Sequence, residues 1–142
     1  MRKAIIALIA ALLTTAATAQ TIEELAAMLA TNRVELSYDC MAGQGAPVHF
    51  SGRLTAQGNC YHLTGNGLDI WCDGTTRWSL DPEAKEVYIE SSEGIREVLS
   101  YRNSISEISV SDVKITASPE EASFFFDVSK LDNSWVITDL RQ

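Results

Sequence analysis

The sequence predicts a mostly β protein of the α+β class: a curved antiparallel sheet, or incomplete β-barrel, with an N-terminal helix packed on its concave face. Two observations lead to this prediction. Apolar residues recur at helical spacing over residues 22–32, and from Val34 onward they alternate with polar residues over short segments separated by turn residues. A sheet with one apolar face has to bury that face, and a sheet that curves around a helix does so most simply.

The N-terminal segment has the three parts of a signal peptide. Arg2 and Lys3 form a positive start, residues 4–13 are apolar, and Ala17-Thr18-Ala19 is the small-residue pattern of a cleavage site. The apolar run is too short to span a membrane as a helix. We therefore expect a cleaved leader at residues 1–19, a single soluble domain at residues 20–142, and a periplasmic location.

The domain is expected to begin with a helix over residues 22–32. Thr21 can cap the first turn, and Glu24, three residues later, completes a capping box. Leu25 and Leu29 lie one turn apart on the apolar face of this helix.

A meander of six short strands is expected to follow the helix. Gly65-Asn66-Gly67 is the strongest turn signal, because Gly and Asn tolerate positive φ. Residues 43–47, Asp73-Gly74 and Asp81-Pro82 mark further turns. The predicted strands cover residues 34–40, 48–55, 60–64, 68–72, 76–80 and 86–90.

The rest of the chain predicts one short helix and three strands. Ile95, Val98 and Leu99 favour a helix within residues 94–101. The strands are expected at residues 108–116, 122–129 and 135–140. On the second of these, Phe124 and Phe126 would share one face and Phe125 would lie on the other.

The composition argues against several classes of function. The formal net charge is −8, and it becomes −10 once Arg2 and Lys3 leave with the leader. So acidic a protein lacks the clustered Lys and Arg that nucleic acids or anionic lipid surfaces require. His49 and His62 have no Ser or Cys at motif spacing, and no metal-ligand pattern joins them to the cysteines. We therefore expect no enzyme, no metal and no cofactor.

The register at the Gly65-Asn66-Gly67 turn decides which side chains share a face. Pairing that is symmetric about Asn66 places Tyr61 opposite Trp71, and Trp78 then continues the same apolar row on the next strand. Large aromatic residues in one patch suit an acyl-chain pocket, and they equally suit an ordinary β core.

The three cysteines leave two alternatives open. The same register places Cys60 opposite Cys72, with Cβ atoms about 4.5–5.5 Å apart, near the upper limit for a disulfide. Either these two form a cross-strand bridge and Cys40 is a buried free thiol, or all three act as small buried hydrophobic residues.

Several segments of the chain, taken in order, resemble one known family. The segments are Gly52-Arg53-Leu54, residues 58–63, residues 70–78, residues 86–89, residues 123–127 and residues 136–141. Their order resembles that of the LolA-type carriers of outer-membrane lipoproteins, in the shorter form known from Bacteroidetes. The resemblance covers most of the domain from Gly52 onward.

The resemblance implies an incomplete barrel with a helical lid over an apolar cavity. It also implies a monomeric carrier and chaperone that takes the acyl chains of lipoproteins, or a similar lipid, between sorting proteins of the inner and outer membranes. The side chains expected to line the cavity are those of Leu25, Leu29, Phe50, Leu54, Tyr61, Leu63, Trp71, Trp78, Val87, Ile89, Phe124 and Phe126.

Two departures from the family keep a second function open. Only residues 91–118 stand where the carriers have several further strands, and Ala56-Gln57 replace an Arg-Pro pair that helps to hold the carriers' lid closed. The alternative is a non-enzymatic envelope interaction module whose barrel is filled by its own side chains. Such a module would bind a partner through a strand edge or an exposed Phe.

Overall fold

The computed structural model describes residues 22–42, 45–99 and 105–142, without the side chains of residues 22–26, 42, 98, 99 and 105–108. The leader predicted at residues 1–19 lies outside the described residues. In chain order the elements are α2 (Ile22–Thr31), β1 (Asn32–Ala42), β2 (Val48–Gln57), β3 (Cys60–Gly65), β4 (Leu68–Cys72), β5 (Thr76–Asp81), β6 (Glu86–Ser91), α3 (Ile95–Leu99), β7 (Ile105–Ala117), η2 (Val128–Lys130) and β8 (Val136–Asp139).

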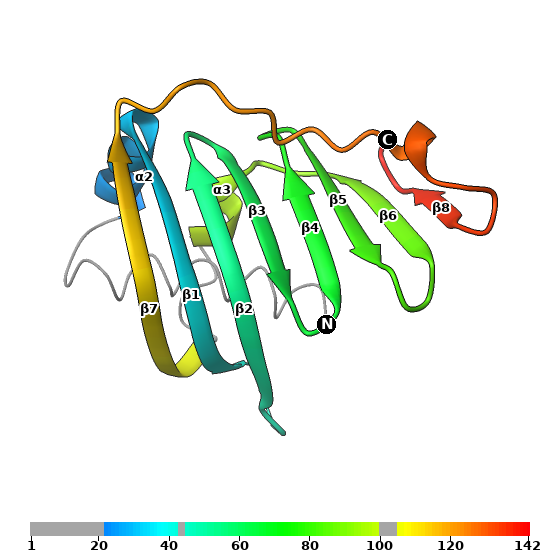
Figure 1. Cartoon of the computed structure of the whole chain (residues 1–142), viewed down its shortest axis with the longest axis horizontal. Helices are drawn as coiled ribbons and strands as arrows, with labels where there is room; N and C mark the ends of the chain where they lie inside the picture. The colour runs from blue at the N-terminus through cyan, green and yellow to red at the C-terminus, as the bar shows by residue number, and fades with distance from the viewer. Residues whose placement is uncertain (1–21, 43–44, 100–104) are drawn as a thin grey trace.

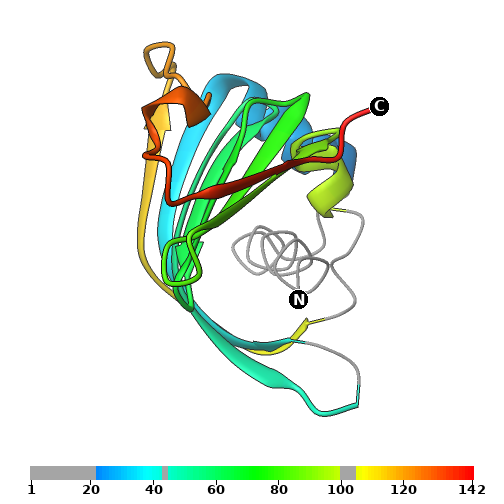
Figure 2. The ribbon, with the colours of Figure 1, turned by 90° about the vertical axis from the view of Figure 1, so that its right-hand side faces the viewer.

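One curved sheet of eight strands forms the body of the described protein, in the order β7-β1-β2-β3-β4-β5-β6-β8. Strands β1 to β6 form an antiparallel meander, and β7 returns to pair antiparallel with β1. The one departure from an antiparallel sheet is β8, which pairs parallel with β6. The sheet stays open, with β7 and β8 as its edges, and α2 and α3 lie on its concave side (Figure 1, Figure 2). The predicted fold class, a curved and mostly β structure, is confirmed.

The two helices agree with the sequence pattern. Helix α2 ends at Thr31, one residue before the predicted end. Its Leu29 is fully buried among sheet residues, and the Leu29 carbonyl oxygen accepts a hydrogen bond from Gly58 N at 2.7 Å. The side chain of Leu25 lies outside the described residues. Within the described part of the chain, no helix is long and apolar enough to cross a membrane.

The hairpin between β3 and β4 has a shorter turn than predicted. Asn66 and Gly67 both have positive φ, 51° and 78°, and Gly65 pairs directly with Leu68. This is the two-residue turn that Asn-Gly favours. The register therefore shifts by one residue from the predicted one, and Tyr61 lies opposite Cys72.

This shift corrects two predictions. Trp71 lies opposite His62 and not opposite Tyr61, so the two aromatic residues point to opposite faces of the sheet. Cys60 and Cys72 also point to opposite faces, and the predicted cross-strand bridge is wrong. Cys40, Cys60 and Cys72, which are all the cysteines of the chain, are free thiols.

The predicted strand at residues 122–129 is also wrong. Residues 119–127 have no strand pairing and lead into the short 3₁₀ helix η2. This segment runs back across the convex side of the sheet, from the end of β7 toward β8 (Figure 1, Figure 2). Phe124 is buried, Phe126 packs on the convex side, and Phe125 is 59 % exposed with its ring edge-on to Trp78. Side-chain packing on the sheet takes the place of strand pairing here.

The apolar side of the sheet changes between β4 and β5. From β1 to β4 the apolar side chains point to the concave face, where they pack with Leu29 of α2 and Ile95 of α3. On β5 and β6 they point to the convex face. The convex cluster holds Trp78, Leu80, Val87 and Ile89, and the residues packed against it are Trp71, Phe126, Val128, Leu131 and Trp135.

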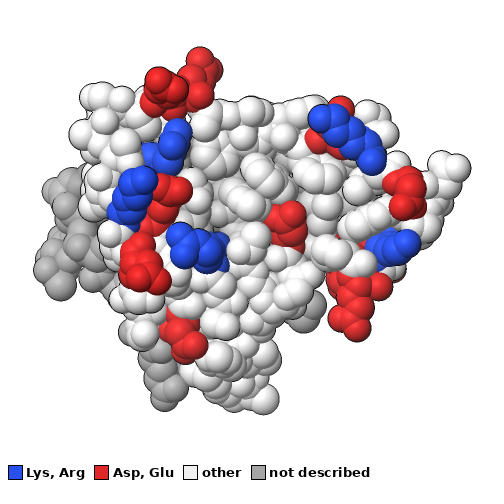
Figure 3. All heavy atoms as spheres, viewed as in Figure 1, with Lys and Arg blue, Asp and Glu red and all other residues white. Residues whose placement is uncertain are grey.

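The convex surface reflects this change. Charged side chains gather over β7, β1 and β2, where this face is polar, whereas the centre is mostly uncharged (Figure 3). The C-terminal segment covers the apolar part of this face. The protein therefore closes its convex apolar cluster with its own chain.

Candidate functional site

The predicted cavity residues fall into two groups on opposite faces. Leu29, Phe50, Leu54, Tyr61 and Leu63 lie together on the concave face. The others with described contacts lie in the convex cluster, so the prediction of a single lining is wrong for them: they are Trp71, Trp78, Val87, Ile89 and Phe126. Phe124 is buried but belongs to neither cluster. For Trp71, Trp78, Val87 and Ile89 the physical reason is the one-residue shift in register, which reverses the facing of β4, β5 and β6. Phe126 lies in a segment that forms no strand.

Two cross-strand rows define the candidate site on the concave face. The first concave row runs from β1 to β6 through Val34, Ala56, Tyr61, Cys72, Arg77 and Glu90. The second concave row runs beside it through Leu36, Leu54, Leu63, Ile70, Ser79 and Tyr88. Both rows are apolar on the first strands and become polar on β5 and β6. The concave face is therefore amphipathic across its width.

The apolar end of the site depends on two glycines. Tyr38 lies opposite Gly52, which pairs in turn with Gly65, and the Tyr38 hydroxyl donates a hydrogen bond to the Thr64 carbonyl oxygen at 3.0 Å. A Cβ on Gly65 would lie 2.2 Å from the Tyr38 hydroxyl and 2.6 Å from the Ser51 carbonyl oxygen. The missing side chains leave room for the buried phenol ring across these strands.

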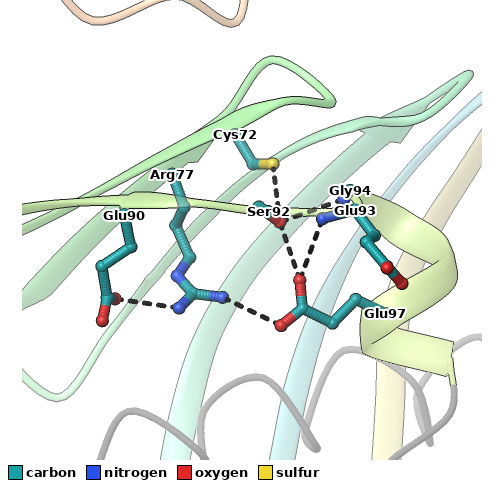
Figure 4. Close-up of polar contacts among 7 residues, drawn as sticks. All are labelled: Cys72, Arg77, Glu90, Ser92, Glu93, Gly94 and Glu97. Carbon is teal, nitrogen blue, oxygen red and sulfur yellow. Dashed lines mark hydrogen bonds and ion pairs between the residues drawn. The ribbon is translucent and has the colours of Figure 1, made fainter. Parts of the chain in front are cut away.

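The polar end is built around a buried arginine. Arg77 is only 6 % exposed, and its Nη2 donates to Glu90 Oε2 on the neighbouring strand at 2.9 Å. Its Nη1 lies 3.9 Å from Glu97 Oε1, on α3. Figure 4 shows the guanidinium between these two carboxylates. One cation therefore faces two anionic groups at the point where the apolar rows end.

A small network holds Glu97 in place. The Ser92 hydroxyl donates to Glu97 Oε2 at 3.1 Å and accepts from Gly94 N at 3.0 Å, and Glu93 N also donates to Glu97 Oε2 (Figure 4). The Cys72 thiol points to the same hydroxyl, with Sγ 3.6 Å from Ser92 Oγ. These contacts fix the start of α3 against β4.

Asn59, in the turn between β2 and β3, fixes α3 from the other side. Its side-chain oxygen accepts from Ile95 N at 3.0 Å, and its amide nitrogen donates to the carbonyl oxygens of Glu93 and Gly74. Gly94 has φ +73°, and a Cβ there would lie 2.4 Å from the Asn59 amide. The Gly94 position thus allows both the turn and the close approach of Asn59.

Burial and the neighbouring carboxylate set the charge states of the polar end. Burial lowers the pKa of the Arg77 guanidinium, but its interactions with Glu90 and Tyr61 together raise that pKa by more. Burial raises the pKa of the Tyr61 phenol and of the Cys72 thiol. Arg77 is therefore cationic, whereas Tyr61 and Cys72 keep their protons and act as neutral hydrogen-bond donors.

Four polar atoms at this end are buried without a hydrogen-bond partner among the described residues. They are Ser79 Oγ, Arg77 Nε, Arg77 Nη1 and Tyr61 Oη, and the Tyr61 and Arg77 side chains lie close enough to interact with each other. Unfilled buried donors are rare in folded proteins and cost free energy. The concave face therefore places buried polar atoms next to its apolar rows.

The thiols of the concave face are held in their protonated form. Both cysteines of the concave face, Cys40 and Cys72, have raised pKa values, Cys40 to about 11 through burial, so neither is an activated nucleophile. His62 lies on the convex face, where it stacks on Trp71 and pairs with Asp69 at 2.6 Å. Among the described residues, no group of three or more His, Cys, Asp and Glu side chains could hold a metal ion.

Arg77, Ser79, Glu90 and Glu97 were missed by sequence reasoning. The sequence did contain a signal. Arg77 and Ser79 alternate with Trp78 and Leu80, so one of these two pairs must point to the same face of the sheet as the apolar residues of the preceding strand. Which pair does so depends on the lengths of two turns, and only the structure fixes these.

Comparisons with known proteins assign this chain to no family. A search against models of known protein families gives no match, and no protein of curated function matches the sequence.

Proposed function

We propose that this protein binds the acyl chains of a lipid-bearing ligand on its concave face, as a periplasmic carrier that delivers lipoproteins toward the outer membrane. The observation that carries the proposal is the pair of concave rows, which are apolar over four strands and polar over the next two. An acyl chain with an oxygen-bearing head has the same division. The leader sequence and the LolA-like order of segments support the location and the cargo.

The proposed mechanism is an exchange of apolar contacts. The last turn of α2 covers part of the concave cluster through Leu29. An acyl chain would displace this turn and bury its own methylene groups, each worth about 0.8 kcal/mol. A lipid with two long chains would thus offset the lost contacts of one helical turn several times over.

Native mass spectrometry of the protein purified from its own periplasm, followed by lipid extraction, tests this function. We expect a stoichiometric acyl lipid or lipopeptide that can be removed and taken up again. A mass without ligand, together with no uptake of added lipopeptide, would contradict the proposal.

A second candidate function is supported by the β8 edge of the sheet. Val136, Ile137 and Leu140 on and beside this edge strand are 60, 47 and 48 % exposed. An edge strand with exposed apolar side chains can pair with a strand of another protein. If the protein carries no lipid, we expect that Ile137→Lys abolishes the binding of its envelope partner, whereas Val48→Lys, at an exposed apolar position of β2 far from this edge, does not.

A further inference from the structure

We propose that Val113 and Ile115 of β7 form a tail site on the concave face, where the far ends of long acyl chains bind. This inference rests on the proposed acyl-binding function and deepens it, because it places the chain ends and predicts a dependence on chain length. Three observations support it: the rows that these residues extend, the β-bulge that turns them inward, and their exposure.

Strand β7 extends the apolar part of the concave face by one strand. Ile115 lies opposite Val34 on β1 and therefore shares its face, so it continues the first concave row. Val113 comes two residues earlier on the strand and points to the same face, in the stretch opposite Leu36 of the second concave row. The apolar part of the concave face thus runs over five neighbouring strands, from the β7 edge to β4 (Figure 1).

A β-bulge in β7 turns these two side chains inward. Val110 already faces the concave side, so regular alternation would turn Asp112 and Lys114 to that side as well. Opposite Leu36, however, β7 carries two residues, Asp112 and Val113, and the extra residue reverses the alternation. Lys114 consequently points to the convex face, and apolar side chains take its place on the concave face.

The bulge has a strained backbone, yet the protein does not bury the side chains that it turns inward. Asp112 has φ +53°, in the left-handed region that is uncommon for residues other than glycine. Val113 and Ile115 remain 47 and 57 % exposed, whereas Val34 and Leu36 beside them are buried. β-Bulges are over-represented next to active sites, where they re-aim side chains. The two inward apolar side chains are therefore available to a ligand.

The division of the concave rows sets the direction of the bound chains. Under the proposed function the head of the ligand lies at the polar strands β5 and β6, so an acyl chain points across β4 to β1 toward β7. The four strand spacings from β4 to β7 amount to about 19 Å. With carbon–carbon bonds of about 1.5 Å, a decanoyl chain extends at most about 14 Å and ends before β7, whereas a palmitoyl chain extends up to about 23 Å.

The test compares one head with two chain lengths. A short neutral peptide with an Nα-decanoyl or Nα-palmitoyl group is titrated into the mature protein and into Ile115→Thr, Val113→Thr and Val136→Thr. Val136 is the matched control, because it is 60 % exposed on the opposite edge strand. We expect each β7 variant to lose about three- to tenfold in affinity for the palmitoyl peptide and nothing for the decanoyl peptide, whereas Val136→Thr binds both as the wild type does.

Melting temperatures without ligand separate the tail site from a structural role. Because Val113 and Ile115 are exposed and Thr keeps their β-branched shape, both β7 variants should melt with the wild type. The bulge itself is tested at Asp112. Asp112→Gly should melt at or above the wild-type temperature, because Gly adopts positive φ freely, whereas Asp112→Val should melt lower.

Each contrary result has a distinct meaning. Equal losses for the two peptides in the β7 variants, or no loss for the palmitoyl peptide, would overturn the tail site. Equal melting temperatures of Asp112→Gly and Asp112→Val would overturn the bulge on which the tail site depends. No binding of either peptide by the wild type would instead overturn the proposed acyl-binding function.

Discussion

Single residues on the concave face set how closely its strands and side chains approach. Tyr38 rests where Gly52 and Gly65 leave space, and its hydroxyl reaches the Thr64 carbonyl because no side chain stands between them. Aromatic rings commonly pack over strand glycines in this way. From the sequence, Gly52 could be read only as a strand residue and Gly65 only as a turn residue, since their contact with Tyr38 depends on pairing across three strands.

Gly65→Ala tests this packing. The added Cβ would meet the Tyr38 hydroxyl at 2.2 Å and the Ser51 carbonyl oxygen at 2.6 Å, and the second of these is backbone that cannot move aside. We expect a loss of about 2 kcal/mol in the free energy of unfolding, measured with urea. Gly67→Asn is the control, because its Cβ would meet nothing within 4 Å and Asn tolerates positive φ. Equal stability of the two variants would contradict the packing.

The cysteines give a second prediction at this scale. Under denaturing, non-reducing conditions a thiol reagent should count three free thiols, because Cys60 and Cys72 lie on opposite faces. In the native protein the partly exposed Cys60 should react first, and buried Cys40, with a pKa raised to about 11, should react far more slowly. A count of one would contradict the register of β3 and β4.

At the scale of elements, the sequence predicted most strands and misjudged how they pair. Alternation and turn residues located β1 to β6, α3 and β8 correctly, because these are local signals. The facing of β4 to β6 depended on whether the Asn66 turn has two residues or three, and a difference of one reverses a face. The segment at residues 122–129 has strand-like composition, but its aromatic residues pack on the convex cluster and do not pair.

Asn59 links separate elements, and Asn59→Ala should loosen α3. The variant removes side-chain hydrogen bonds to Ile95 N and to the carbonyl oxygens of Glu93 and Gly74. We expect about 1 kcal/mol lower stability and faster amide hydrogen exchange over residues 92–97, where Glu97 faces Arg77. Asn133→Ala, at an exposed site, is the control. Unchanged exchange in this segment would show that α3 is held by other contacts.

At the scale of the whole molecule, the two faces of the sheet differ in what covers them. The C-terminal segment packs on the convex cluster over β4 to β6, whereas the concave face carries apolar rows beside buried polar atoms. Trp71, Trp78 and Trp135, which are all the tryptophans of the chain, lie in the convex cluster. Native tryptophan emission therefore reports the convex face, and a ligand on the concave face needs a reporter of its own.

The most direct test of binding on the concave face is quenching by a brominated acyl ligand in Phe50→Trp. Phe50 is buried in the concave cluster, so the new indole would lie beside the ligand, whereas the native tryptophans lie across the sheet. We predict that a lipopeptide with brominated chains quenches the added emission of Phe50→Trp strongly and the wild type weakly, and that the same lipopeptide without bromine quenches neither. Strong quenching of the wild type with no extra effect in the variant would place the ligand on the convex face and contradict the account.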